Sequence, residues 1–151
     1  MNDLVRSAAA HSARILLVDD NRSGLMARRV VLEELGFTTD GAPDAQMALD
    51  LFSQEHYDLV VTDFRMPDMD GVELIARLRA TSPNTPIILI SGFVDAIGLN
   101  EKTTGANVVI MKSANEVTHL VRAANRLLKT PRKPPRAERP AQRPRKKIVG
   151  R

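Results

Sequence analysis

The sequence predicts an α/β fold, a doubly wound parallel sheet of five strands with helices on both faces. Short apolar runs bounded by turn residues recur along the chain, and such runs are typical of strands buried on both faces. Apolar residues at helical spacing lie between these runs, so that strand and helix patterns alternate five times. This alternation indicates parallel strands joined by right-handed crossover connections.

Length and composition narrow the class of protein. The 151 residues are enough for one domain with a buried core, and they include no cysteine, which excludes disulfides, thiol catalysis and cysteine-based zinc sites. The first residues lack the long apolar core of a signal peptide, and no apolar run approaches the roughly 18 residues of a membrane span. We therefore expect a cytoplasmic protein without a membrane span.

Charge divides the chain into an acidic body and a basic tail. Residues 131–151 contain nine Lys or Arg and one Glu, whereas residues 1–130 contain 13 Lys or Arg and 17 Asp or Glu, so the tail is at +8 and the remainder at −4. Five prolines break any helix in the tail, and its charges repel one another. We expect a flexible leader over residues 1–13, a folded domain over 14–130 and a disordered, Pro-rich basic tail over 131–151.

The first half of the folded domain predicts two strands and two helices. Residues 14–20 indicate a buried strand that ends in two aspartates, and the Thr-rich residues 37–40 indicate a weak strand at an edge. Between them, residues 21–23 can cap a helix that Gly36 terminates. Pro43 suits the first turn of the next helix, whose apolar positions have amphipathic spacing: Ala45, Ala48, Leu49 and Phe52.

The second half continues with three strands, predicted at residues 59–63, 86–90 and 108–111. The helix that follows Gly71 stops before Ser82. A helix over residues 93–104 is expected from the alternation, but Gly98 and Asn100 weaken it. The last helix, which ends near Lys129, is predicted to begin with a capping box in which Ser113 caps the helix and Glu116 reaches back.

Polar residues follow four of the predicted strands: Asp19, Asp20, Asp63, Ser91 and Lys112. These strand ends share one edge of a doubly wound sheet, where ligands bind, and Asp63 could act there as a metal ligand, a nucleophile or a helix cap. Three carboxylates repel one another unless a cation neutralises them, and Mg²⁺ prefers such oxygen ligands. With Lys112 and Ser91, the metal could bind a phosphoryl group that one carboxylate accepts.

At these residues the chain resembles the receiver domain of two-component response regulators, of a stand-alone type with a basic C-terminal tail. The resemblance covers roughly residues 13–129. It depends on residues 17–21, on the string Asp-x-x-Met-Pro-x-Met-Asp-Gly that begins at Asp63, on Ser91-Gly92, and on Gly105-Ala106 leading to Lys112. It implies a flavodoxin-like (βα)5 fold with strand order 2-1-3-4-5.

The resemblance also implies a role for each site residue. Asp63 would be the phosphoacceptor of a phosphoprotein. Mg²⁺ would be the cofactor, bound directly by Asp20, by Asp63 and by the backbone carbonyl of Arg65, and mostly through water by Asp19. The remaining two positions would be a switch hydroxyl and a phosphate-binding lysine, here Ser91 and Lys112.

Two residues depart from the family's usual pattern. The family commonly has an aromatic residue three positions before the lysine, where this chain has Val109, and a proline in a cis peptide after it, where this chain has Ser113. A cis bond without proline costs about 2.5–4 kcal/mol. We therefore expect a reshaped turn after Lys112 and a changed readout of phosphorylation.

In function, the resemblance implies phosphorelay signalling and not an enzyme, with Mg²⁺-dependent self-phosphorylation and dephosphorylation as the only chemistry. A sensor histidine kinase or a phosphotransfer protein would supply the phosphoryl group, and the phosphorylated chain would signal by protein–protein contact with a downstream target. Two alternatives stay open. One is a phosphate sink or relay without a target; the other is a receiver that gates nucleic-acid binding by residues 131–151.

Overall fold

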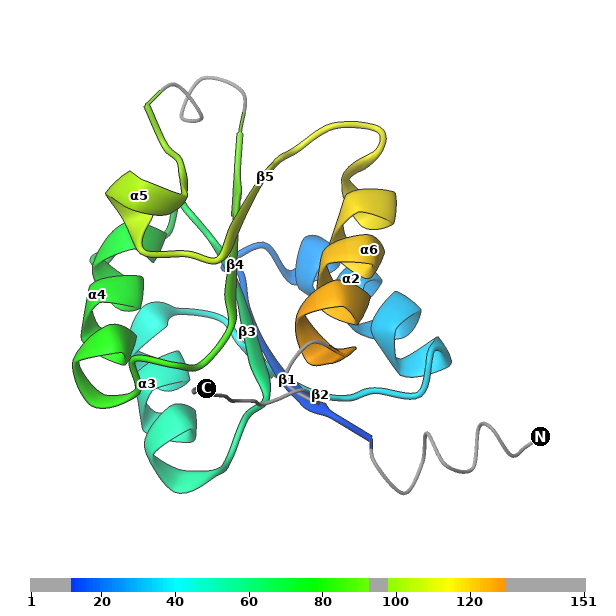
Figure 1. The fold of residues 1–151 in the computed structure, drawn as a ribbon, viewed down its shortest axis with the longest axis horizontal. Helices are drawn as coiled ribbons and strands as arrows, with labels where there is room; N and C mark the ends of the chain where they lie inside the picture. The colour runs from blue at the N-terminus through cyan, green and yellow to red at the C-terminus, as the bar shows by residue number, and fades with distance from the viewer. Residues whose placement is uncertain (1–11, 93–97, 130–151) are drawn as a thin grey trace, which may run out of the picture.

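The computed structural model describes residues 12–92 and 98–129, which form a parallel sheet between two layers of helices (Figure 1). The sheet has five strands in the order β2-β1-β3-β4-β5. This confirms both the fold class and the strand order that the resemblance implied. The strands are β1 (Arg14–Val18), β2 (Thr38–Ala42), β3 (Leu59–Asp63), β4 (Ile87–Ser91) and β5 (Val108–Met111).

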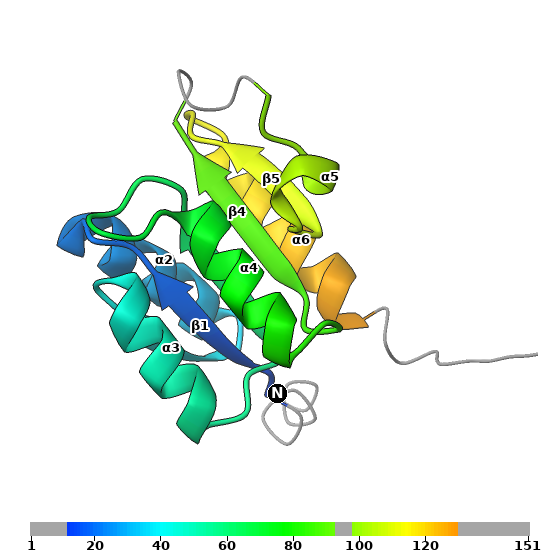
Figure 2. The same cartoon turned by 90° about the vertical axis from the view of Figure 1, so that its left-hand side faces the viewer.

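The helices cover both faces of the sheet. In Figure 1, α2 (Arg22–Glu34) and α6 (Glu116–Lys129) lie on one side, and α3 (Ala45–Gln54), α4 (Gly71–Thr81) and α5 (Glu101–Thr104) lie on the other. Figure 2 shows the second layer in front of the sheet, with β1 and β4 pointing toward the same edge. No helix in the described segments combines the length and the hydropathy that crossing a bilayer requires.

Alternate residues of the central strands supply two separate cores. Leu16 and Val60 face α3 and α4, whose contributions include Ala48 and Leu74. The intervening strand residues face α2 and α6 in the second core, which includes Ile15, Leu17, Val61, Leu32 and Leu120. Because both faces are buried, β3 and β4 contain only buried residues, as the uninterrupted apolar runs predicted.

The predictions for residues 1–11 of the leader, for residues 93–97 of the weak helix and for the whole tail lie outside the described residues. The last two leader residues are described and contact the sheet. The Ser12 hydroxyl donates to the Gly36 carbonyl oxygen at 2.6 Å, and the Thr38 N–H donates to the Ala13 carbonyl oxygen at 3.0 Å.

The start of α3 differs from the prediction. The N-cap is Asp44, whose carboxylate accepts the Met47 N–H at 2.8 Å, so Pro43 precedes the helix instead of occupying its first turn. The neighbouring edge strand β2 begins one residue later and ends two residues later than predicted, because Gly41 and Ala42 pair with Leu17 and Val18 of β1.

The helix expected over residues 93–104 is confirmed at residues 101–104 and contradicted at residues 98–100. Helix α5 is confined to Glu101–Thr104. Gly98 has a φ of 82°, a left-handed conformation that interrupts a helix, and Asn100 is extended. The Asn100 side chain accepts the N–H groups of Lys102 and Thr103, so a residue expected inside the helix is its N-cap.

The capping box expected before α6 is also wrong. The helix begins at Glu116, and the Ser113 hydroxyl accepts the Asn115 N–H at 3.1 Å. The Glu116 carboxylate does not turn back toward Ser113. It binds Arg28 of α2, since a buried guanidinium needs a counter-ion more than an exposed N–H needs an acceptor.

Candidate functional site

Three carboxylates meet at the carboxyl edge of the sheet. Asp19 and Asp20 follow β1, Asp63 ends β3, and one oxygen from each lies within 4.8 Å of the other two. Asp19 and Asp63 are buried, whereas Asp20 is exposed. Burial raises the pKa of Asp19, and the nearby charge of Asp63 acts in the same direction. The predicted acidic cluster is therefore assembled, with one of its members facing solvent.

Asp63 lies at the centre of the site. Its Oδ2 atom accepts from the Lys112 ammonium at 2.8 Å, while its Oδ1 atom is buried and has no hydrogen-bond partner in the described residues. The strand end is held firmly, because the Phe64 N–H donates to the Ile90 carbonyl oxygen at 2.8 Å and the Gly71 N–H donates to the Phe64 carbonyl oxygen at 2.7 Å. One carboxylate oxygen thus accepts from Lys112, whereas the other makes no hydrogen bond in the described residues and has an ion-pair contact with Arg28 at 3.4 Å.

Ser91 and Lys112 reach the site from the two strands beyond β3. Ser91 ends β4 and is 1% exposed, and its hydroxyl also lacks a hydrogen-bond partner within the described residues. Lys112 follows β5, and its N–H donates to the Ser91 carbonyl oxygen at 2.8 Å. Buried polar atoms without partners cost about 1–3 kcal/mol each. Such atoms at one sheet edge are typical of a site that binds a polar group.

The turn after Asp63 leads into α4. Asp70 caps that helix by accepting the Glu73 N–H at 2.9 Å, and Asp68 has a left-handed φ of 68°. Neither carboxylate belongs to the acidic cluster. Arg65 lies in this turn with its side chain exposed, two residues after Asp63, and its carbonyl as a metal ligand stays a prediction.

Sequence reasoning missed Arg28 and Glu116. Arg28 of α2 is 5% exposed, and its Nη1 atom lies 2.8 Å from Asp19 Oδ2 and 3.4 Å from Asp63 Oδ1. Its Nε and Nη2 atoms donate to Glu116 Oε2 at 2.9 and 2.7 Å. Pairing with these acids raises the pKa of the guanidinium, although burial alone would lower it.

The sequence did contain a signal that Arg28 is buried. Arg28 lies three residues after Leu25 and four before Leu32, so it falls on the apolar stripe of the helix.

The two residues that depart from the family's usual pattern take ordinary structural roles. Val109 is half-buried and packs against the core that faces α3 and α4. Ser113 is exposed, and the peptide that joins Lys112 to it is trans, because no peptide bond is cis in the segments that the structure covers. The expected reshaping of this turn is thus a trans peptide followed by a hydrogen-bonded turn at Ser113.

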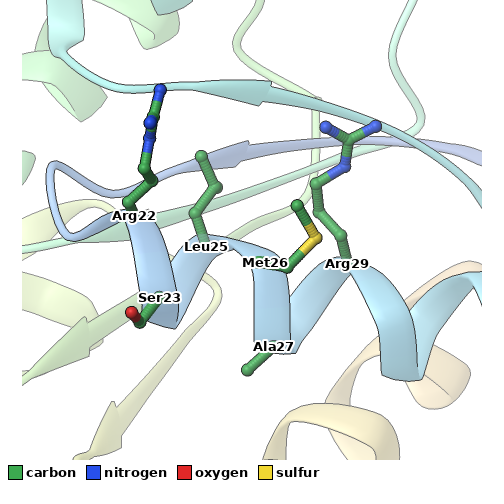
Figure 3. A pocket seen from close by; sticks show the side chains of 6 residues that line it. All are labelled: Arg22, Ser23, Leu25, Met26, Ala27 and Arg29. Atoms are coloured by element: carbon green, nitrogen blue, oxygen red, sulfur yellow. The ribbon is translucent and has the colours of Figure 1, made fainter.

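A surface hollow on α2 is separate from this edge. It has a volume of about 720 Å³ and no acidic lining residue (Figure 3). Its lining residues are Arg22, Ser23, Leu25, Met26, Ala27 and Arg29. None of the polar residues at the strand ends lines this hollow.

Comparison with protein families gives a match over most of the chain. The model of the response regulator receiver domain matches residues 15–125. Among curated proteins, the regulatory protein AtoC of Escherichia coli is 35% identical over 82 residues, which are 54% of this chain and 18% of AtoC. Response regulator MprA of Mycolicibacterium vanbaalenii is 38% identical over 78 residues, 52% of this chain and 34% of MprA. The chain thus spans about a third or less of the length of these two relatives.

Solved structures give the same result at the level of the fold. Response regulator TrrA from Thermotoga maritima, in complex with Mg²⁺-BeF, has a TM-score of 0.70 and 30% identity, with 77% of this chain and 99% of that one covered. Chemotaxis response regulator CheY4 of Vibrio cholerae has a TM-score of 0.70 and 27% identity, with 78% and 99% covered.

Proposed function

The chain belongs to the response regulator receiver domain family, and on that premise we propose that Asp63 accepts a phosphoryl group. The observation that supports this most directly is the environment of Asp63, a buried carboxylate with Lys112 at 2.8 Å and two further carboxylates beside it. A carboxylate oxygen would attack phosphorus, an acyl O–P bond would form, and the bond from phosphorus to a histidine nitrogen of the donor would break. Receiver domains are signalling domains, so this transfer would be the switch and not a metabolic reaction.

The residues at the edge fit a hard divalent cation. Three carboxylates lie within reach of one ion, and the buried Asp63 Oδ1 accepts no hydrogen bond from the described residues. Asp20 and Asp63 would bind Mg²⁺ directly, with the Arg65 carbonyl as a further ligand and Asp19 acting through water. When bound, the metal would neutralise charge on the transferring phosphoryl group. Lys112 would bind another phosphoryl oxygen, and the Ser91 hydroxyl would donate to it.

The partners of this reaction follow from the proposal. A sensor histidine kinase or a phosphotransfer protein would be the donor, and the output would be a protein–protein contact. The +8 tail over residues 131–151 lies outside the described residues, so nucleic-acid binding by the tail stays a prediction from composition.

Phosphorylation by a small donor tests the proposal. Incubation of the full chain with a small acyl phosphate and Mg²⁺ is expected to add one phosphoryl group, which alkali and hydroxylamine remove, as they remove an acyl phosphate. Chelation of the metal should prevent the addition, and fragment mass spectra should place the group on Asp63. A group that resists hydroxylamine, or that maps outside residues 59–63, would show that a hydroxyl or another residue is the acceptor.

Metal binding provides an independent test. Asp20→Asn is expected to weaken Mg²⁺ binding at least about tenfold, because it removes a charged direct ligand. Asp68→Asn is the matched control, since asparagine tolerates the left-handed φ of 68° and keeps the turn. A magnesium titration followed by amide chemical shifts measures both. Equal weakening by the two substitutions would mean that the metal binds nearer to Asp68 in the turn than proposed.

A further inference from the structure

Arg28 joins the acidic cluster to a fourth carboxylate, that of Glu116, which lies 88 residues later in the sequence. Its Nη1 atom is 2.8 Å from Asp19 Oδ2 and 3.4 Å from Asp63 Oδ1, so it contacts two of the three clustered acids. Its Nη2 atom is 2.7 Å from Glu116 at the start of α6. The Arg28 side chain is 6% exposed and that of Glu116 is 18% exposed. A fixed positive charge is therefore built into the site from the side of α2.

This charge occupies the same carboxylates that a metal would use. A divalent cation held by the cluster must share Asp19 and Asp63 with the guanidinium, and like charges a few Å apart repel strongly in a buried site. We propose that Arg28 is a resident cation of the site that competes with Mg²⁺ for Asp19 and Asp63, and that Glu116 sets the strength of this competition. The inference rests on the metal site of the proposed function.

Glu116 acts through Arg28. Both of its hydrogen bonds to the guanidinium end on one oxygen, and the pair adds no net charge to the site. The Glu116 carboxylate offsets part of the charge that Arg28 presents to the cluster. Without Glu116, the full charge of Arg28 falls on Asp19 and Asp63. The two residues should therefore change metal affinity in opposite directions, which a purely structural ion pair would not do.

The test is the affinity of the unphosphorylated full chain for Mn²⁺, read by electron paramagnetic resonance, with Mg²⁺ as competitor. Arg28→Gln is expected to tighten binding roughly tenfold, since one unit charge leaves a buried site. Glu116→Gln is expected to weaken binding roughly threefold. In the Arg28→Gln background, Glu116→Gln should change affinity by less than about twofold, because its route to the metal is gone.

Matched controls come from the next pair on α2. The half-buried Arg29 and the exposed Glu33 form an ion pair at 3.5 Å and both bond Thr39 of β2, and Arg29→Gln and Glu33→Gln make the same changes in net charge outside the cluster. Both should shift affinity by less than about twofold, as screened surface charges do. This pair separates a local effect of Arg28 from an effect of total charge.

Several outcomes would overturn the inference. These are an Arg28→Gln chain whose affinity is unchanged or lower, a Glu116→Gln effect equal in both backgrounds, and equal effects of Arg28→Gln and Arg29→Gln. If the Arg28→Gln chain does not fold, Glu116→Gln against Glu33→Gln decides alone, and equal affinities reject the inference. An Asp20→Asn chain that binds metal as tightly as wild type would instead show that the metal site of the proposed function is wrong.

Discussion

Asp63→Asn is expected to abolish phosphorylation, reducing the label by at least about 100-fold. The amide cannot act as the nucleophile, because it lacks the charged oxygen that attacks phosphorus. The fold should survive, since asparagine has nearly the same shape and its amide oxygen can still accept from Lys112, which lies 2.8 Å from Asp63 Oδ2. Intact mass after incubation with a small acyl phosphate and Mg²⁺ measures the loss.

The control for this substitution is Asp68→Asn, five residues later in the same turn and outside the acidic cluster. It should leave labelling within about twofold of wild type, because the charge it removes is solvent-exposed. Labelling of the Asp63→Asn chain at the wild-type level would assign the phosphoryl group to another residue and remove the basis of the proposed function.

Gly71→Ala is expected to destabilise the domain by about 3 kcal/mol. A Cβ atom at this position would lie 2.3 Å from the Asp63 carbonyl oxygen, 2.8 Å from Leu89 Cδ1 and 3.0 Å from Phe64 Cα. Two of these atoms are backbone, so no side-chain rotation relieves the contact. Because the Gly71 N–H also donates to the Phe64 carbonyl oxygen, the clash would push the turn away from the strand that ends in Asp63. Equilibrium unfolding in urea, followed by circular dichroism, measures the cost.

Gly98→Ala is the matched control for this prediction. Gly98 has a φ of 82°, but no atom of the described residues lies within 4 Å of the point that an alanine Cβ would occupy. Only the left-handed backbone penalty of about 1 kcal/mol therefore applies. If both substitutions cost the same, close packing of Gly71 against β3 is not what fixes the turn.

The positions of the strand-end residues could be predicted because they follow from two simple properties. Strands buried on both faces need continuous apolar runs, and parallel connectivity places all their carboxyl ends at one edge. Spacing alone therefore places Asp19, Asp63 and Lys112 correctly, and Lys112 lies 2.8 Å from Asp63 across 49 residues of sequence. The element boundaries were less predictable, as Pro43 shows, because capping depends on which nearby side chain accepts an N–H.

Arg28 and Glu116 were missed for a different reason. Local sequence offers Glu116 a plausible role in a capping box, and nothing local reveals a partner 88 residues away. The choice between the two roles is made by burial of Arg28, which its place on the apolar stripe of α2 indicated without identifying the partner. Likewise, Gly98 and Asn100 indicated from sequence that the expected helix is weak. The residue at which the helix starts could not be predicted, because it depends on the backbone conformation of Gly98.

The separations along the chain rank the ion pairs of the site by the entropy cost of closing each contact. Asp19 and Arg28 are nine residues apart, Lys112 and Asp63 are 49 apart, and Arg28 and Glu116 are 88 apart. The entropy lost on closing a loop grows with its length, so the Asp19–Arg28 contact is the least costly to form. Among the ion pairs of the site, the contact with the lowest closure cost is thus the one that places a positive charge beside the clustered carboxylates.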